Sequence, residues 1–284
     1  MRFIGLAPAW RPGEANEKPS CLVVLDERGG IVANAFASGA EEIVKAVGEN
    51  AGDGRPVLVG VDAPLSVPNE RGTRKVEKVL SKLSLPAYSA SRRMFEGKPF
   101  TEDLLAEFEK LSVEYTDYLF PRGKGRWAVE VDSAATLKVL SLERNGGKND
   151  GDLSEKLKEI PESKFRKGNK EARAAALKAA IGVLWDTKGL RLRTGDLAAD
   201  LKAEGNVDVS KLDVSAKLSH AELDKIVALV EGTLAAYTAH RHWKGRDGSM
   251  VVGLGDEGSV LLPANEGFQA RIAEECRASK VPYV

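Results

Sequence analysis

Two acidic residues lie at the ends of apolar runs, where strands would present their carboxylates to a ligand. Asp62 follows the run PVLVGV, and Glu130 lies near the end of GRWAVEV. In an open α/β sheet, groups at the carboxyl ends of strands project into the crevice where ligands bind, and an unpaired buried charge is otherwise costly. Converging carboxylates suit Mg²⁺ or Mn²⁺, which prefer oxygen ligands and keep water molecules for a phosphate substrate. Asp62 and Glu130 are therefore candidate metal ligands.

A third acidic residue, Asp224, belongs to a strong predicted helix over residues 219–239. Ser219 and Glu222 form the S-x-x-E pattern of a capping box at its start. Asp224 lies on the flank of the apolar stripe, one turn beyond His220, so these two side chains share a face. The helix thus adds a carboxylate suited to metal binding and an imidazole suited to proton transfer.

Each of these acids also has a purely structural interpretation. Asp62 is suited to accept hydrogen bonds from backbone N–H groups in an Asp-Pro-type turn, and Asp224 to remain solvated. Glu130 is suited to a salt bridge with Arg74 or Arg126. Convergence of the three carboxylates on one crevice would distinguish a site from these alternatives.

The elements that must position these residues begin with short apolar runs separated by turn-forming residues. Residues 2–10, 21–26 and 31–37 are predicted strands, the last two joined by DERGG as a hairpin. Residues 38–50 show apolar positions at helical spacing. The following run, PVLVGVDA, has apolar residues on both faces, which favours a central strand covered by helices on each side. The predicted opening is βββαβ in an α/β fold.

The rest of the chain alternates predicted helices with two further strand signals. Helices are expected at 72–83, 101–120, 170–185 and 219–239, and a strand at GRWAVEV runs into another helix. MVVGL and SVLLP bracket GDEG as a late hairpin. We expect one domain over residues 1–284, with an inserted helical and loop segment at about 84–126 and a mobile loop at about 145–152.

Composition sets limits on the class of protein. The chain has 284 residues, of which 43% are hydrophobic and 30% charged, so it can bury a substantial core. Its 42 basic and 42 acidic residues balance, so any site for a polyanion must be local. Cys21 and Cys276 form neither a metal-type cluster nor a disulfide framework. A reducing cytoplasm is the expected location, because no secretory signal and no apolar run long enough for a membrane span is found.

Six segments, in order, resemble the family catalogued as domain of unknown function 429. They are GVDAPLSVP, the following helix with Arg74 and Glu77, VEVDSAA, FRKGNKEARAAALKAAIG, HAELDKIVALVEGTLAAY and GDEGSVLLP, and together they span nearly the whole chain. The resemblance implies a ribonuclease H-like mixed sheet and a nuclease activity. It matches Asp62 to the family's strand-end aspartate, Glu130 to the glutamate of its V-E-V motif and Asp224 to the aspartate of its helix motif. His220 fits a polar residue one turn before that aspartate.

The resemblance fails at the first strand. The family pattern resembles G-I-D-x-A-W, whereas this chain has Gly5, Leu6 and then Ala7, where an aspartate is expected. A methyl group ligates no metal, which puts two-metal catalysis in doubt. Glu14 and Asp26 do not stand at the matching position. Asp132 likewise replaces an aromatic residue that the family commonly shows.

Polar and basic residues within the matched segments are candidates for ligand binding. We expect Ser66, Arg74, Lys170 and Arg173 to contact a phosphorylated substrate. Basic runs at 92–93, 122–126, 164–170 and 240–246, with Trp127 and Trp243 as stacking platforms, would suit a nucleic-acid groove. Such runs are more often solvated edges, and a net charge of zero favours that interpretation for any single run.

Three functional hypotheses follow. The leading one is a nuclease in which Asp62, Glu130 and Asp224 bind Mg²⁺ or Mn²⁺ for phosphodiester hydrolysis of nucleic acid or another phosphorylated ligand, with His220 relaying a proton. The alternative is a catalytically silent binding or scaffold protein of the same fold that lost hydrolysis with Ala7. Nucleotide binding of the sugar-kinase and actin kind ranks last, because WRPGEANEKPS lacks a glycine-rich phosphate turn.

Overall fold

The computed structural model describes residues 1–9, 19–52, 54–96, 100–117, 125–145, 153–160, 165–192, 208–255 and 258–284. Some residues on which predictions were made therefore lie outside the described ranges. These are Glu14, the basic residues 122–124, Lys164, the GDEG positions 256–257, and the predicted mobile loop beyond Asn145 as far as residue 152.

A mixed sheet of six strands forms the centre of the described structure, in the order β3-β2-β1-β4-β6-β5. Its strands are β1 (Arg2–Ala7), β2 (Ser20–Leu25), β3 (Ile31–Ala37), β4 (Val57–Val61), β5 (Glu114–Tyr115) and β6 (Arg126–Glu130). The pairs β1–β2 and β2–β3 are antiparallel, whereas β1–β4, β4–β6 and β5–β6 are parallel. The predicted βββαβ opening is confirmed, and so is the α/β class. The predicted insertion also contributes β5, a sheet edge that the sequence analysis did not foresee.

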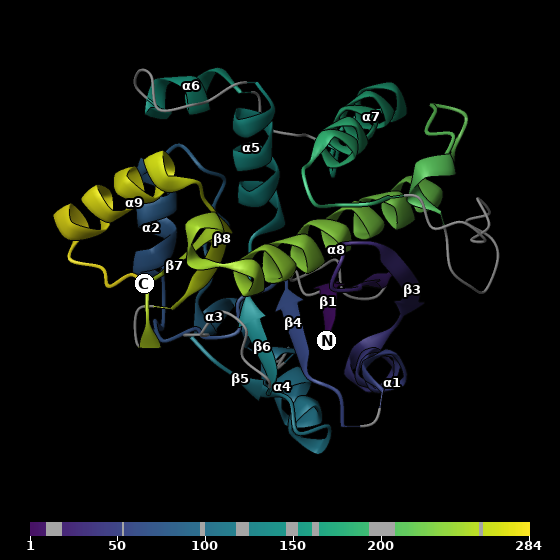
Figure 1. The fold of residues 1–284 in the computed structure, drawn as a ribbon, viewed down its shortest axis with the longest axis horizontal. Coiled ribbons are helices and arrows are strands. Elements are labelled where there is room, and N and C mark those ends of the chain that lie inside the picture. Colours follow the sequence, from purple (N-terminus) through teal and green to yellow (C-terminus); the bar gives the residue numbers. More distant parts are fainter. Residues whose placement is uncertain are drawn as a thin grey trace.

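Helices cover both faces of this sheet (Figure 1). They are α1 (Gly39–Ala51), α2 (Lys75–Lys82), α3 (Arg92–Phe95), α4 (Phe100–Lys110), α5 (Ser133–Arg144), α6 (Leu153–Glu159), α7 (Lys170–Asp186), α8 (His220–Lys244) and α9 (Glu266–Ser279). In Figure 1, α8 runs across the sheet with α5 and α7 beyond it, while α1 and α4 lie on the opposite side. The capping box predicted at Ser219 and Glu222 starts α8.

The two faces of the sheet bury different sets of side chains, because successive residues of a strand point to opposite sides. Phe3, Leu58 and Val129 pack in one cluster with the apolar residues of α7 and α8. Their neighbours Val59 and Ala128 pack in a second cluster with α1 and α4. Both faces are therefore buried, as the unbroken apolar run in β4 predicts. The face on which a strand-end residue lies decides which helices it meets.

Glycines let α8 approach the central strands closely. A Cβ atom added to Gly5 in β1 would lie 1.9 Å from the carbonyl oxygen of Gly232, and one added to Gly60 in β4 would lie 2.6 Å from that of Ala235. No side chain fits between these backbones. The contact of Gly5 with Gly232 fixes the height of α8 on the sheet, and hence the position of the preceding residue, Glu231.

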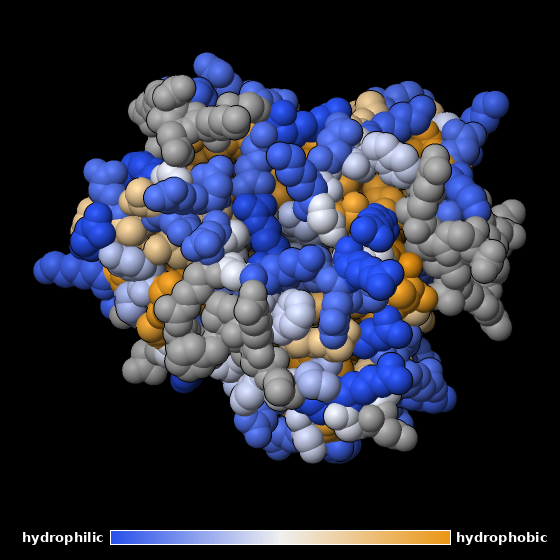
Figure 2. All heavy atoms as spheres, in the orientation of Figure 1, coloured by the Kyte–Doolittle hydropathy of each residue, from blue (hydrophilic) through white to orange (hydrophobic). Residues whose placement is uncertain are grey.

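The predicted late hairpin is also present, as β7 (Ser249–Val252) paired antiparallel with β8 (Val260–Pro263). It packs with α2 and α9 in a third apolar cluster. Within the described ranges, no helix combines the length and the apolar character needed to cross a bilayer. Hydrophilic side chains cover most of the face in Figure 2, with apolar side chains showing between them.

Candidate functional site

Asp62 directly follows β4 and is buried on the α8 face of the sheet. Its Oδ1 accepts a hydrogen bond from the backbone N–H of Ser133 at 2.9 Å, and its Oδ2 accepts one from the Ser133 hydroxyl at 2.6 Å. Ser133 is the first residue of α5, so the carboxylate also benefits from the positive end of that helix. The Asp62 side chain is thus held in one orientation.

Glu231, from the middle of α8, shares a cationic partner with Asp62. The Arg166 guanidinium donates from Nε to Glu231 Oε1 and lies, through Nη2, 3.2 Å from Asp62 Oδ2. All three side chains are nearly buried, with exposed fractions of 10% to 12%. Two carboxylates from elements far apart in the sequence therefore meet on one guanidinium at the carboxyl end of the central strands. The sequence analysis named Asp62 but missed Glu231 and Arg166.

Burial, and secondarily the neighbouring negative charges, shift the pKa of Asp62. Burial raises the pKa of the Asp62 carboxyl group to about 8, with further contributions from Glu231 and then Asp132, while the two Ser133 hydrogen bonds oppose the rise. Asp132 itself caps α5 by accepting a hydrogen bond from Ala135 N. The expectation that like charges would raise the pKa of a carboxyl group holds for Asp62, but the neighbours responsible are not those named from sequence.

Glu130 does not join Asp62, which corrects the expected cluster of three acids. In the parallel register of β4 and β6, Glu130 pairs with Val61, so its side chain lies on the face opposite to that of Asp62. There it receives two hydrogen bonds from Arg74, at 2.5 and 2.9 Å, and one from Leu65 N. Burial raises the pKa of Glu130, and Arg74 opposes that rise. The structural alternative, a salt bridge to Arg74, is the one that the structure adopts.

Arg74 is buried in a network of its own, which Ser66 joins only through its backbone carbonyl oxygen. The remaining Arg74 donors go to Glu77, through Nε at 2.7 Å, and to the Ser66 carbonyl oxygen, through Nη1 at 2.8 Å. Glu77 also accepts from the backbone N–H groups of Arg74 and Ala90. The Arg74 guanidinium is buried and its donors have partners within the protein, so the structure gives the expected contact of Arg74 with a substrate no support.

Asp224 and His220 share a face of α8, as predicted, but they meet Arg173 there and not Asp62. Arg173 Nη2 lies 2.5 Å from Asp224 Oδ1, and Nη1 lies 3.0 Å from His220 Nδ1. Arg173 Nε donates to the Phe165 carbonyl oxygen, so this guanidinium is also fully engaged. Asp224 precedes Glu231 by two helical turns, roughly 10 Å along the axis. This cluster fastens α7 to the start of α8.

The other residues predicted to contact a ligand are placed as follows. Lys170 is the first residue of α7 and is partly exposed. Arg126 donates to the carbonyl oxygens of Gly52 and Leu111 and so ties loops together. Trp127 and Trp243 pack against the apolar core, which makes them poor stacking platforms. Asp26 accepts from Gly30 N and does not reach the site.

Ala7, at which the resemblance predicts an aspartate, lies beside Asp62. The last register pair of β1 and β4 is Leu6 with Val61, and Asp62 N donates to the Leu6 carbonyl oxygen at 2.8 Å. Ala7 has the same parity as Phe3 and Gly5, so it points toward α8. The predicted neighbourhood of Ala7 and Asp62 is therefore correct.

The two carboxylates of Asp62 and Glu231 provide enough oxygen ligands for one divalent cation but not for two. Asp62 and Glu231 offer carboxylate oxygens within reach of a single guanidinium, and Mg²⁺ is commonly bound by one or two carboxylates together with water and phosphate oxygens. In the described part of the chain, no group of three or more His, Cys, Asp or Glu residues is placed to hold a metal ion. Ala7 offers no ligand for a second cation.

Two signals in the sequence could have located this pair. Glu231 interrupts a long apolar stretch, VALVEGTLAAY, and a charged residue inside a buried helix calls for a partner. Strand parity separates Asp62 from Glu130 once β4 and β6 are aligned in register. The partner, Arg166, carries no comparable signal, because it lies in a basic surface-like run.

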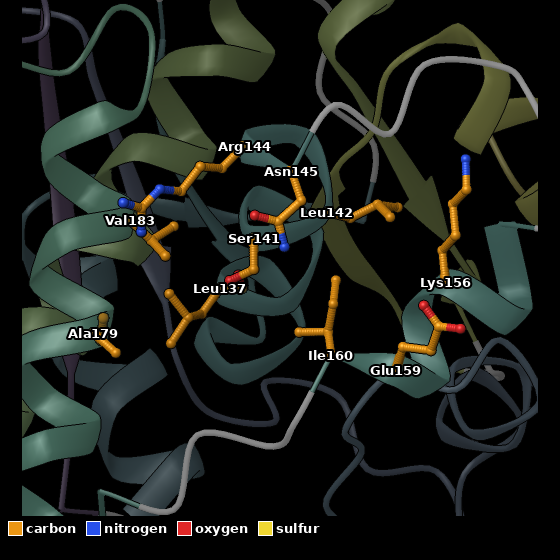
Figure 3. Close-up of a pocket in the computed structure, with 11 residues that line it drawn as sticks. Leu137, Ser141, Leu142, Arg144, Asn145, Lys156, Glu159, Ile160, Ala179 and Val183 are labelled. Atoms are coloured by element: carbon orange, nitrogen blue, oxygen red, sulfur yellow. The ribbon is translucent and has the colours of Figure 1, made fainter.

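A pocket lies away from this pair, between α5, α6 and α7 (Figure 3). It has a volume of about 550 Å³. In Figure 3, Leu137, Ser141 and Asn145 lie between Val183 and Ala179 on one side and Glu159 and Lys156 on the other. None of the residues that line it belongs to the Asp62–Glu231 pair. No protein-family model, curated protein or solved structure matches the chain, so the case for the Asp62–Glu231 pair rests on its geometry.

Proposed function

We propose that this chain is a ribonuclease H-like, divalent-metal-dependent phosphodiester hydrolase that acts on nucleic acid and uses one Mg²⁺ or Mn²⁺ between Asp62 and Glu231. The observation that carries the proposal is the convergence of these two buried carboxylates on Arg166 at the carboxyl end of the central strands. The βββαβ opening and the resemblance of the matched segments to domain of unknown function 429 support the fold assignment.

The residues of the site have distinct tasks in this proposal. When bound, the cation would polarise the scissile phosphate and lower the pKa of a water molecule. Asp62 and Glu231 would hold it, and Ser133 would keep the Asp62 carboxylate oriented through its N–H and hydroxyl groups. His220 has no part here, because it precedes Glu231 by about three helical turns, roughly 16 Å along α8.

Cleavage assays with paired variants test the proposal. Labelled single-stranded, duplex and branched nucleic acids are incubated with Mn²⁺ or with EDTA. We expect Mn²⁺-dependent cleavage by the wild type and by Asp224→Asn, and none by Asp62→Asn or Glu231→Gln. Asp224→Asn is the matched control, because it changes an arginine-bound acid on the same helix outside the pair. Equal cleavage by all four proteins would contradict the assignment.

A second candidate function is a catalytically silent protein of the same fold that binds nucleic acid. Ala7 favours it, because the position beside Asp62 offers a methyl group instead of a carboxylate. The distinguishing variant is Ala7→Asp, which adds the missing ligand. If the wild type is inactive with every cation and Ala7→Asp gains metal-dependent cleavage, the chain is a silent relative of a nuclease. If the wild type cleaves, the silent candidate is wrong.

A further inference from the structure

Arg166 occupies the space that the proposed cation would need. Its Nε and Nη2 groups engage Glu231 and Asp62, so a guanidinium and a divalent cation cannot both sit between these carboxylates. The arginine neutralises part of the charge that would otherwise be buried there. In the structure described, Arg166 therefore takes the role of an internal counter-cation.

The third donor group of this guanidinium has no acceptor. Arg166 Nη1 is buried and forms no hydrogen bond with any of the described residues. A buried donor without a partner is costly, and a planar guanidinium favours an acceptor with several charged oxygens, such as a phosphate group. Arg173 is the contrast within the same segment, because its Nε, Nη1 and Nη2 groups all have partners.

The Arg166 guanidinium also lies against Tyr88, an aromatic residue at the surface. The Arg166 guanidinium carbon is 5.2 Å from the centroid of the Tyr88 ring, and Tyr88 is 43% exposed. Arg166 lies in the turn before α7, where Phe165 is buried and anchors the backbone. A rotation of the long Arg166 side chain along this aromatic face would let it change partners with its backbone in place.

We infer that Arg166 is a substrate-positioning residue that leaves Asp62 and Glu231 when a divalent cation binds them, and then binds a phosphate group of the substrate. This inference rests on the proposed cation site. Beyond the cation site itself, Arg166 is the residue that the cation displaces, and a phosphate group of the substrate is its new partner. The exchange leaves every charged group with a partner: cation with carboxylates, and guanidinium with phosphate.

Chemical modification reads out the movement directly. The protein is treated with phenylglyoxal, which reacts with accessible guanidinium groups, and labelling of Arg166 and Arg173 is quantified by peptide mass spectrometry. We expect Arg166 to be protected without cation and labelled several times faster with Mn²⁺, while Arg173 stays protected in both. A phosphorothioate oligothymidylate added with Mn²⁺ should restore the protection of Arg166.

Cation affinity gives the second readout, by calorimetric titration of Mn²⁺ into the variants. Arg166→Gln should bind Mn²⁺ roughly tenfold or more tightly than the wild type, as expected for two ligands that exclude one another. Arg173→Gln, the matched control, should bind it as the wild type does. In the presence of Mn²⁺, Arg166→Gln should bind the oligothymidylate more weakly.

The outcomes separate this inference from the proposed function. If Mn²⁺ binds the wild type through Asp62 and Glu231 but leaves Arg166 labelling unchanged, the inference is overturned and the cation site stands. If Mn²⁺ binds Arg166→Gln and not the wild type, Arg166 does not give way to the cation, and both the inference and the metal-dependent activity of the wild type are overturned. If Mn²⁺ binds neither protein, the proposed cation site is wrong and the inference falls with it.

Discussion

The carboxylates of Asp62 and Glu231 bind the same guanidinium, that of Arg166, although one acid ends a strand and the other lies in the middle of a helix. The close contact between Gly5 and Gly232 sets this arrangement, because it fixes α8 against β1 immediately beside Glu231. The pair therefore depends on the packing of a helix on a sheet.

Thermal unfolding should distinguish the pair from the neighbouring acid on α8. A cation that binds only the folded state increases the free energy of unfolding, by about 2.7 kcal/mol when its concentration is a hundred times the dissociation constant. The unfolding midpoint then rises. We expect Mn²⁺ to raise the midpoint of the wild type and of Asp224→Asn, and to leave that of Glu231→Gln unchanged. Loss of the response in Asp224→Asn with retention in Glu231→Gln would reverse the assignment.

The buried Arg74–Glu130 pair should contribute to the free energy of unfolding and not to activity. Glu130→Gln removes the charge that faces Arg74 and weakens the acceptor for Leu65 N. Breaking a buried pair by changing one partner commonly costs about 3–5 kcal/mol, and we expect about 3 kcal/mol because Glu77 still faces the arginine. Urea unfolding provides the measurement.

The matched control is Lys158→Ala, which breaks an ion pair with Glu155 in which both side chains are about 60% exposed. Such surface pairs contribute less than about 1 kcal/mol. Equal effects of Glu130→Gln and Lys158→Ala would show that the Glu130 network is not buried as described.

Gly5→Ala should destabilise the fold and disturb the site together. Its Cβ atom would lie 1.9 Å from the Gly232 carbonyl oxygen and 2.2 Å from Ala236 N, so α8 must shift. Overpacking of this kind costs about 1–3 kcal/mol and occasionally more, and contact with backbone atoms places this variant at the upper end. Urea unfolding measures the cost, and a reduced Mn²⁺ response would report the displaced Glu231.

Gly245→Ala is the control for that variant, because nothing lies within 4 Å of its added Cβ atom. Its backbone is extended, with φ at 164°, so alanine is compatible with the conformation. We expect a change of less than about 1 kcal/mol. A Gly5→Ala protein as stable as Gly245→Ala would contradict the close helix–strand contact.

His240 should make the fold sensitive to acid. Its Nε2 donates to the Glu27 carbonyl oxygen, and its buried Nδ1 has no hydrogen-bond partner among the described residues. Burial lowers the pKa of His240 below its ordinary value, with Lys244 adding to the effect and Asp26 opposing it. As the pH falls through about 6.5, the unfolded chain binds this proton first. Stability then decreases by up to about 1.4 kcal/mol per pH unit until the folded protein is protonated as well.

Urea unfolding of the wild type and of His240→Gln between pH 8 and pH 5 checks this expectation. Glutamine keeps a donor for the Glu27 carbonyl oxygen but does not titrate. The wild type should lose more stability than the variant over this range. Parallel losses in the two proteins would show that His240 is not the group responsible.

The sequence by itself determined the class of fold and most of its elements. Apolar runs specified β1 to β4, and the 3.6-residue spacing and the capping box specified α8. These patterns are local, because each is set by residues that are near one another in the sequence. Asp62 was found for the same reason, since a carboxylate at the end of a buried strand stands out within a few residues. Ala7 was identified beside it from the resemblance of the first strand.

Only the tertiary structure decided which charges meet. The register of β6 on β4 turned Glu130 to the face opposite Asp62, and two helical turns separated Asp224 from the acid that does reach the site. Glu231 and Arg166 became partners through the Gly5–Gly232 contact and the turn before α7, neither of which has a periodic signal. Pairing of buried charges is non-local, because each charge needs a counter-charge within a few ångströms and any segment of the chain can supply it.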